Sequence, residues 1–383
     1  MRPYDVVLFG ATGFTGGLVA RQLAARATAS GARWAIAGRD RAKLEALRDQ
    51  LAAEEPAHGD VPIIVARSDA PDTLRRMVEQ TRVIATTVGP FDQFGDPLVD
   101  ACVEAGTDYV DITGEPAFWR RTIDRHHGRA SERGILVVPC CGFDSIPHDL
   151  GALFTAQHLP GDGALQLDGF VRASGEPSGG TWASAIHAMA NLRQTKSEHR
   201  SGTKPSGPRD PGPRIHHEAA VDQWVVPFPS VDPLVVRRSA RFTPEFGDGF
   251  RYHHYLQVAS LPKLAKLLAG TAAVVAMAQL RPTRDLLLRW RAQGDGPSDE
   301  VRARSKFVVT FVGHRDGKSI RTEVSGRDPG YGLTAVMLAE SALTLVHDRD
   351  RLPHRGGVLT PAAGLHVPLL DRLQRAGLDF RVV

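Results

Sequence analysis

One short stretch decides the fold of this chain: Gly10-Ala11-Thr12-Gly13-Phe14-Thr15-Gly16. It follows the apolar run 5–9 directly and precedes a segment with helical spacing, so it marks a turn from a strand into a helix. Glycines in such a turn let backbone N–H groups approach a phosphate, and the N-terminus of the helix adds unpaired donors and partial positive charge. The stretch therefore predicts a dinucleotide-binding turn. A tight turn that binds no ligand is the alternative.

The segments after this turn alternate between short apolar runs and amphipathic stretches up to about residue 150. The runs are continuous in apolar residues, which is typical of parallel strands buried on both faces. The expected strands are 5–9, 34–37, 63–66, 83–87, 109–112 and 135–139. The expected helices are 15–27, 42–52, 72–80, 97–105 and 116–133. This order predicts a Rossmann-type, doubly wound parallel sheet.

The pattern changes near residue 160 and predicts an inserted α+β domain on a mostly antiparallel sheet. The residues 201–213 include seven Gly or Pro and predict a loop or lid. From residue 332 the helical spacing returns in a tail that we expect to pack on the first domain. The expected strands of the inserted domain are 165–174, 231–240, 250–259, 305–314 and 318–325, and its expected helices are 181–192 and 261–280. A last short strand is expected at 379–382.

Composition narrows the class of protein. The 383 residues are 42% apolar and 23% charged, as in a folded globular chain. The net charge of +4 is scattered among acids, so we expect no nucleic-acid partner. Three cysteines cannot build a disulfide framework, which suits the cytoplasm. We expect no metal site, because the chain has neither Cys-x-x-Cys nor His-Glu-x-x-His.

Two other nucleotide-dependent classes are excluded by their motifs. None of the five tyrosines is followed four positions later by lysine, so the Tyr-x-x-x-Lys of short-chain dehydrogenases is absent. A P-loop needs Gly-Lys-Ser/Thr. The first 150 residues contain one lysine, Lys43, and it follows an alanine.

The choice of cofactor depends on the end of the second expected strand, which reads Ala35-Ile36-Ala37-Gly38-Arg39. An acid there would bind the ribose 2′-hydroxyl of NAD, whereas an arginine accommodates the 2′-phosphate of NADP. Arg39 can bind a phosphate through two parallel hydrogen bonds, and Asp40 is expected to cap the next helix. The sequence therefore predicts NADP(H).

Further contacts to the cofactor are expected where later strands end. Asp69 can accept a hydrogen bond from the adenine amino group, or it can cap a helix instead. The small residues at 88–91 form an edge where the ribose and nicotinamide would lie. The expected cofactor-binding residues are Gly10, Ala11, Thr12, Gly13, Phe14, Thr15, Arg39, Ser68, Asp69, Val88, Gly89, Pro90, Phe91 and Cys141.

Blocks spread over nearly the full length carry a resemblance. They lie at 4–16, 35–39, 88–99, 105–115, 141–147 and 355–361, and the most specific are Tyr-Val-Asp-Ile-Thr-Gly-Glu and Cys-Gly-Phe-Asp-Ser-Ile-Pro. With them the chain resembles the saccharopine dehydrogenase-like family, most closely its actinobacterial branch of trans-acting enoyl reductases, which act beside polyketide synthases in lipid assembly. Residues 195–305 resemble the family weakly, and substrate contacts are expected there.

The resemblance implies a Rossmann domain, an inserted domain and an NADP-dependent enzyme. We expect an NADP-binding domain at 1–155, a substrate or dimerisation domain at 156–330, and C-terminal helices at 331–383. The leading hypothesis is reduction of an activated carbon–carbon double bond on a small-molecule or carrier-bound acyl or polyketide-like substrate. The alternatives are an imine reductase or amino-acid dehydrogenase, and a non-catalytic nucleotide-binding scaffold.

Reduction of a conjugated double bond leaves an enolate, which needs a proton and hydrogen-bond donors. Ligands of a doubly wound sheet lie beyond the carboxyl ends of its strands. Among the polar residues there, we rank Asp144 first and Glu115 second as the proton donor, with Ser145 as a donor to the enolate oxygen. Asp144 and Ser145 can instead cap a helix, and Asp111 and Glu115 can instead brace the sheet.

The segment 261–280 combines Lys263 and Lys266 with a long Leu/Ala/Val body. Its longest apolar run is 14 residues, which is shorter than the roughly 20 that a spanning helix needs. A buried helix that packs two domains or two subunits of a homodimer is one interpretation. The other is an interfacial helix that makes a peripheral contact with a membrane.

Overall fold

The computed structural model describes residues 2–174, 182, 186, 189–190, 212–290 and 298–383. These residues form two compact units. Unit 1 contains Met1–Phe143 and Tyr331–Ala376, and unit 2 contains Asp144–Gly330 and Gly377–Val383. The expected helix 181–192 and the expected loop 201–213 lie for the most part outside the described residues.

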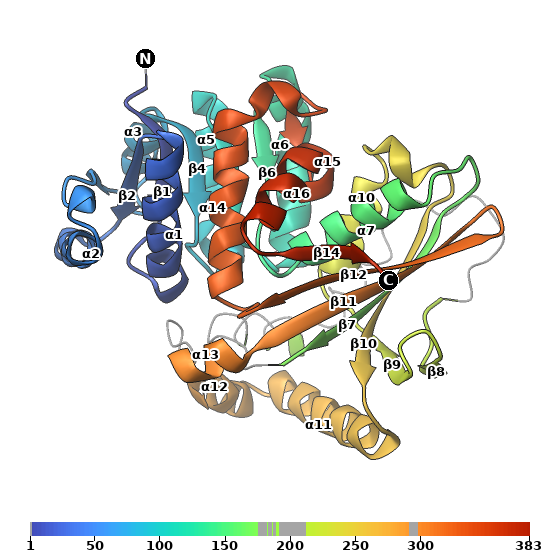
Figure 1. Cartoon of the computed structure of the whole chain (residues 1–383). Coiled ribbons are helices and arrows are strands. Elements are labelled where there is room, and N and C mark those ends of the chain that lie inside the picture. Colours follow the sequence, from blue (N-terminus) through green and yellow to red (C-terminus); the bar gives the residue numbers. More distant parts are fainter. Residues whose placement is uncertain (1, 175–181, 183–185, 187–188, 191–211, 291–297) are drawn as a thin grey trace. The chain divides into compact units, whose positions relative to one another are not determined.

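Unit 1 is built on a parallel sheet, sheet A (Figure 1). Its strands are β1 (Tyr4–Phe9), β2 (Trp34–Gly38), β3 (Ile63–Val65), β4 (Thr81–Thr86), β5 (Asp108–Asp111), β6 (Leu136–Val138) and β13 (Gly357–Val358). The order is β13-β6-β5-β4-β1-β2-β3, and every neighbouring pair is parallel. The six expected strands are confirmed. The sequence analysis missed β13, because two residues are too short a run to show a pattern.

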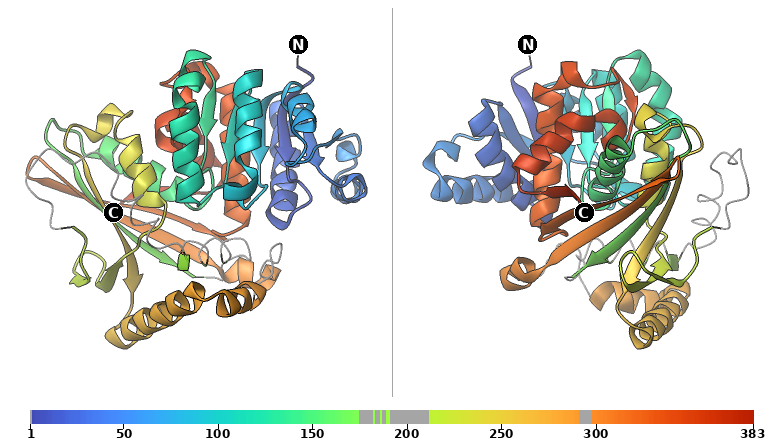
Figure 2. Two further views of the ribbon diagram at one scale, coloured as in Figure 1. Left: turned by 180° about the vertical axis from the view of Figure 1, so that it is seen from behind. Right: turned by 45° about the vertical axis from the view of Figure 1, so that its right-hand side comes forward.

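Helices cover both faces of sheet A (Figures 1 and 2). They are α1 (Phe14–Ser30), α2 (Arg41–Glu54), η1 (Pro56–His58), α3 (Pro71–Val78), α4 (Phe91–Phe94), α5 (Asp96–Ala105), α6 (Pro116–Glu132), α14 (Gly332–His347), η3 (Arg349–Arg351), α15 (Pro361–Gly364) and α16 (His366–Arg375). Helix α14 contacts β1, β4, β5, α1 and α16, so nearly all of its residues are buried. It is accordingly apolar on all sides. Its one buried acid, Glu340, pairs with Arg26 at 3.2 Å and Arg372 at 3.3 Å.

Unit 2 is built on a mixed sheet, sheet B. Its strands are β7 (Gln166–Ala173), β8 (His216–Glu218), β9 (Gln223–Pro227), β10 (Arg251–Val258), β11 (Lys306–Arg315), β12 (Lys318–Arg327) and β14 (Asp379–Val382). The order is β14-β12-β11-β7-β10-β9-β8, and only the pair β7–β10 is parallel among the described strands. The expected α+β domain on a mostly antiparallel sheet is therefore confirmed.

Unit 2 also contains helices among its described residues. They are α7 (Ile146–His158), α10 (Asp232–Ser239), η2 (Pro244–Phe246), α11 (Leu261–Gln279), α12 (Arg281–Trp290) and α13 (Asp299–Arg304). Helix α7 lies on β7, β11 and β12, and α10 contacts both α7 and β10. One consequence is that the first turns of α7 and α10 and the strand β10 meet in the interior of unit 2.

The expected strand at 231–240 is wrong, because these residues form helix α10. Its first turn holds Asp232 and Pro233, where proline has no N–H to lose and an acid complements the helix dipole. The buried residues Val235, Val236 and Ser239 follow helical spacing. The β-branched residues of this segment favour a strand, but the acid and the proline of the first turn favour a helix more strongly.

The C-terminal tail divides between the two units. Helices α14, α15 and α16 belong to unit 1, as expected. Residues 377–383 do not, because β14 pairs with β12 in sheet B. Phe380 is the buried residue of this short strand, and β12 would otherwise leave an unpaired edge, so pairing there decides its place. The boundary between the two units lies after Phe143, before α7, whereas the sequence predicts a boundary after residue 155.

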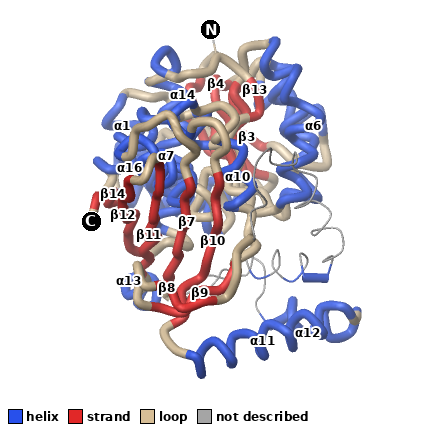
Figure 3. The backbone as a smooth tube through the Cα atoms, turned by 90° about the vertical axis from the view of Figure 1, so that its right-hand side faces the viewer, coloured by secondary structure: helices blue, strands red, loops and turns tan. Residues whose placement is uncertain are grey.

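Helix α11 is long and apolar enough to cross a membrane by length and composition, and 11% of its most apolar 18-residue window is buried. Most of the helix is therefore exposed among the described residues. Its buried residues are Leu264 and Ala278. Figure 3 shows α11 and α12 running on from one another, away from the strands of sheet B.

Candidate cofactor site and acid–histidine cluster

The glycine turn is packed so closely that two positions exclude a side chain. Gly10 follows β1 with a φ of 91°, and a Cβ there would lie 2.7 Å from Cγ2 of Val88. A Cβ on Gly16 would overlap the carbonyl oxygen of Gly10 and lie 2.9 Å from its carbonyl carbon. The backbone of Gly10 donates to the carbonyl of Ala37 at 2.9 Å, which fixes the turn to β2. The turn thus has the tight backbone that close approach to a pyrophosphate requires.

The start of α1 is open to an anion. Its N-cap is Gly13, no described side chain caps it, and its first turn holds no acid. Helix α2 differs, because Asp40 accepts a hydrogen bond from the backbone of Lys43 at 3.2 Å, as expected. The N–H groups and the dipole of α1 therefore fit a phosphate. On this geometry the residues 10–15 suit the cofactor predicted from the sequence.

The exposed Arg39 stands directly after β2, where a 2′-phosphate would lie. Asp69 is also exposed, and Arg67 holds it with two bonds of 2.9 and 2.8 Å. These bonds lower the pKa of Asp69, and the charge of Arg39 lowers it further. Asp69 does not cap α3, whose N-cap is Ala70. Arg67 was not among the residues expected at this site. The signal that could have indicated it is an arginine shortly after a strand of such a sheet.

The residues 88–91 lie beside the glycine turn. Thr87 donates its hydroxyl to the carbonyl of Gly10 at 3.1 Å, which ties the end of β4 to the end of β1. Glu115 holds the next turn, because its carboxylate accepts from the backbone N–H groups of Phe91 at 3.1 Å and Asp92 at 2.8 Å. This geometry favours bracing as the role of Glu115, which sequence reasoning ranked second as the proton donor.

Asp111 is fully buried at the end of β5 and braces the sheet. Its carboxylate accepts from the Tyr109 hydroxyl at 2.7 Å and from the backbone N–H groups of Thr113 at 2.9 Å and Cys140 at 3.0 Å. Burial raises the pKa of Asp111 to about 6, and these hydrogen bonds act against the rise. Cys141 is fully buried as well, and its thiol donates to the carbonyl of Val138.

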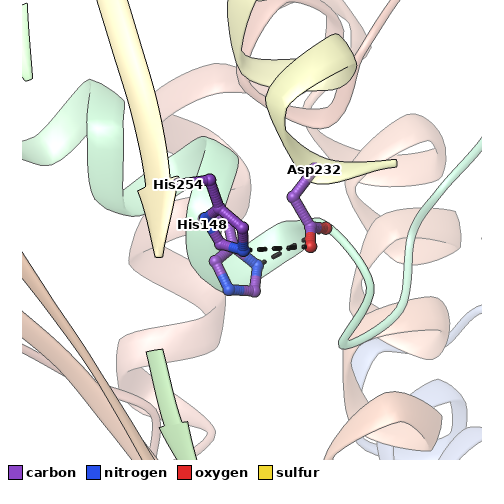
Figure 4. Close-up of side chains that lie close together, drawn as sticks. All are labelled: His148, Asp232 and His254. Carbon is purple, nitrogen blue, oxygen red and sulfur yellow. Dashed lines mark ion pairs between the residues drawn. The ribbon is translucent and has the colours of Figure 1, made fainter. Parts of the chain in front are cut away.

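Asp144 and Ser145 begin unit 2, and Ser145 is fully buried beside a cluster that the sequence did not reveal. Figure 4 draws three members of this cluster, His148, Asp232 and His254. The Ser145 hydroxyl donates to Asp232 at 3.0 Å, so Ser145 does not cap α7 with its side chain. Burial and the charge of Asp232 raise the pKa of Asp144 to about 7. The hydroxyl of Ser230 donates to the other oxygen of Asp232 at 2.5 Å. Burial acts to raise the pKa of Asp232, but His148, His254 and the hydroxyls of Ser230 and Ser145 lower it on balance.

Two histidines complete this acid–histidine cluster (Asp144, His148, Asp232 and His254). The His148 Nδ1 lies 3.5 Å and the His254 Nε2 lies 3.6 Å from the Asp232 carboxylate. Burial lowers the pKa of His148, and burial with the charge of His148 lowers the pKa of His254 to about 3. His254 Nδ1 lies 3.0 Å from the Tyr252 hydroxyl. The ligand atoms of His148, Asp232 and His254 lie within 4.8 Å of one another, so they could also hold a metal ion.

Comparison with known proteins places these features in context. The model of the saccharopine dehydrogenase NADP-binding domain matches residues 6–138. A trans-acting enoyl reductase of Mycobacterium ulcerans is 35% identical, covering 98% of this chain and 97% of the relative. The human saccharopine dehydrogenase-like oxidoreductase is 30% identical, covering 100% and 98%. Apo saccharopine dehydrogenase (L-Glu forming) of Saccharomyces cerevisiae has a TM-score of 0.55 at 13% identity, covering 99% and 100%, so it shares the fold.

Proposed function

Because this chain belongs to the saccharopine dehydrogenase-like family of NADP-binding oxidoreductases, we propose that it reduces an activated carbon–carbon double bond of an acyl or polyketide-like substrate. Its cofactor is NADP(H), and the matched NADP-binding domain lies within unit 1. The observation that carries the proposal is the full-length similarity to a relative named trans-acting enoyl reductase. The substrate can be a free thioester or an acyl group on a carrier.

The proposed reaction needs three events that balance. Bound NADPH, held by residues 10–15 and Arg39, would supply the hydride that the β-carbon accepts. The electron pair of the C=C bond then forms a bond between the α-carbon and the carbonyl carbon, and the π pair of the carbonyl moves onto its oxygen to give an enolate. The enolate then takes a proton at its α-carbon, which yields the saturated product and NADP⁺. The protein must therefore hold the cofactor, stabilise the enolate oxygen and supply one proton.

Asp144 is the residue we propose as the proton donor. Its pKa of about 7 lets it carry a proton at neutral pH, and the ionised Asp232 beside it disfavours loss of that proton. Ser145 directs its hydroxyl to Asp232, so we assign it a positioning role for that carboxylate. We also assign Glu115 a positioning role, because its carboxylate accepts hydrogen bonds from the backbone N–H groups of Phe91 and Asp92.

The test is a comparison of substrate classes with the purified protein. NADPH oxidation is followed with α,β-unsaturated acyl thioesters of increasing chain length, and separately with keto acids plus amines. Turnover on the enoyl thioesters alone supports the proposal. Turnover confined to the keto acids and amines would transfer the assignment to imine reduction. Binding of NADPH without turnover on either set would favour a non-catalytic scaffold.

Arg39→Ala tests the cofactor assignment. Loss of a charge-assisted bond to the 2′-phosphate should weaken NADPH binding by about 1.5–3 kcal/mol and leave NADH binding little changed. Isothermal titration with both cofactors measures this difference. Arg41→Ala is a matched control, because Arg41 is also exposed but pairs with Glu45 at 3.4 Å. An equal loss of affinity for both cofactors would contradict the role of Arg39.

A further inference from the structure

Helices α11 and α12 form an exposed apolar surface in unit 2. Leu280 is 63%, Leu286 61% and Trp290 75% exposed. The inner side of the pair packs on described residues of the chain, including Trp182 and Ile186, around the buried Ala278 and Leu287. Apolar surface of this kind is costly in water and typically marks a contact with another molecule or with lipid.

The charge on the same helices indicates which kind of molecule contacts this apolar surface. Residues 261–290 contain Lys263, Lys266, Arg281, Arg284 and Arg289 and one acid, Asp285, so their net charge is five minus one, or +4. The whole chain also has a net charge of +4, so the other residues are balanced in sum. The chain thus concentrates its excess positive charge on its most apolar exposed helices. Anionic lipid headgroups complement this combination.

A second copy of the chain fits this surface less well. A symmetric dimer would bring the same patch of both subunits together, and the two +4 segments would face one another. In such a dimer the segment 261–290 of the second copy would offer one acid, Asp285, to the basic residues of the first. A bilayer with anionic lipids removes that repulsion and also buries the leucines and Trp290.

We propose that α11 and α12 dock the protein on anionic membranes, with the apolar side chains of both helices in the acyl–headgroup boundary and the lysines and arginines among the lipid phosphates. Lys263 and Lys266 occupy the first two turns of α11, and Trp290 ends α12, so polar or interfacial anchors lie at both ends of the segment. This docking is independent of the substrate.

Vesicle flotation tests the docking with the full chain. The protein should float with vesicles of phosphatidylcholine mixed with phosphatidylglycerol at low salt and much less with phosphatidylcholine alone. Trp290 should report insertion by a blue shift of its fluorescence, which Trp290→Phe removes. Protein that stays in the soluble fraction with anionic vesicles, or that binds both vesicle types equally, would overturn the proposal.

Paired variants separate the apolar and the charged contributions. Lys263→Glu with Lys266→Glu should reduce partitioning by about tenfold or more, since each basic residue near an anionic surface contributes to binding. Leu280→Glu should reduce it as well. Lys318→Glu and Ile215→Glu are matched controls at exposed positions outside the segment and should leave partitioning unchanged. If the α11 variants instead split a dimer in sedimentation and vesicles do not bind, the surface is a contact between copies.

Discussion

Gly16→Ala should strongly weaken NADPH binding, whereas Gly17→Ala next to it should leave binding intact. A methyl group on Gly16 meets the Gly10 carbonyl, and backbone on both sides of the turn has to move. A methyl group on Gly17 has its nearest neighbour, an Arg21 nitrogen, 3.8 Å away. The displaced turn loses one or more charge-assisted bonds to the pyrophosphate, so we expect affinity to fall about 100-fold or more.

The same pair of variants should change stability in opposite directions. Gly16→Ala costs about 1–3 kcal/mol, as is usual for overpacking. Gly17→Ala lies inside α1 and should stabilise the protein by about 0.5–1 kcal/mol, because alanine loses less conformational freedom than glycine in a helix. Titration of NADPH and denaturant unfolding measure the two effects. Similar NADPH affinities for both variants would contradict the turn described here.

Asp144→Asn should lower the rate of the chemical step by about 100- to 10,000-fold, the usual worth of a general acid. The variant keeps the shape of the side chain and removes its titrating proton. In the wild-type protein the donor is the protonated form, so turnover should fall as the pH rises through the pKa of about 7. NADPH affinity should be unchanged, because Asp144 is not among the residues assigned to cofactor binding.

Two controls make the Asp144 result specific. Glu115→Gln should keep the pH profile, since its role is to hold α4, and any loss should follow cofactor affinity or stability. Turnover after treatment with a chelator shows whether a metal at His148, Asp232 and His254 contributes, and we expect no change. Full turnover of Asp144→Asn, with or without an unchanged pH profile, would show that another group or solvent supplies the proton.

The sequence was a good guide to sheet A because local features determine it. The apolar runs and the glycine turn can each be recognised within a few residues, and the six expected strands are present. Sheet B was harder to predict. Its strands alternate imperfectly, and the segment 231–240 mixes β-branched residues with a proline and an acid that start a helix.

The acid–histidine cluster could not be predicted, because its members are far apart in the chain. His148 meets Asp232 and His254 only when α7, α10 and β10 pack together. The histidines His253 and His254 are neighbours on strand β10. In the structure His253 contacts Asp168 at 3.0 Å, whereas His254 turns to Asp232. Short-range spacing gives no sign of that difference.

The role of Glu115 could not be predicted from the sequence either. An acid at the end of a strand in a doubly wound sheet suggests catalysis. Its carboxylate instead accepts from N–H groups that lie 24 and 23 residues earlier in the chain. The resemblance to known proteins could not resolve this, since a shared motif does not state which atoms its side chains contact.

Transfer of deuterium from NADPH to the product tests the central claim most directly. The purified protein is given NADPH deuterated at C4, in each of its two stereoisomeric forms, with an α,β-unsaturated acyl thioester in ordinary water. The account predicts a saturated product that carries one deuterium at the β-carbon from one of the two forms. A parallel reaction with unlabelled NADPH in D₂O should place deuterium at the α-carbon. Unlabelled thioester products, together with label transfer to the carbon of an imine formed from a keto acid and an amine, would contradict it.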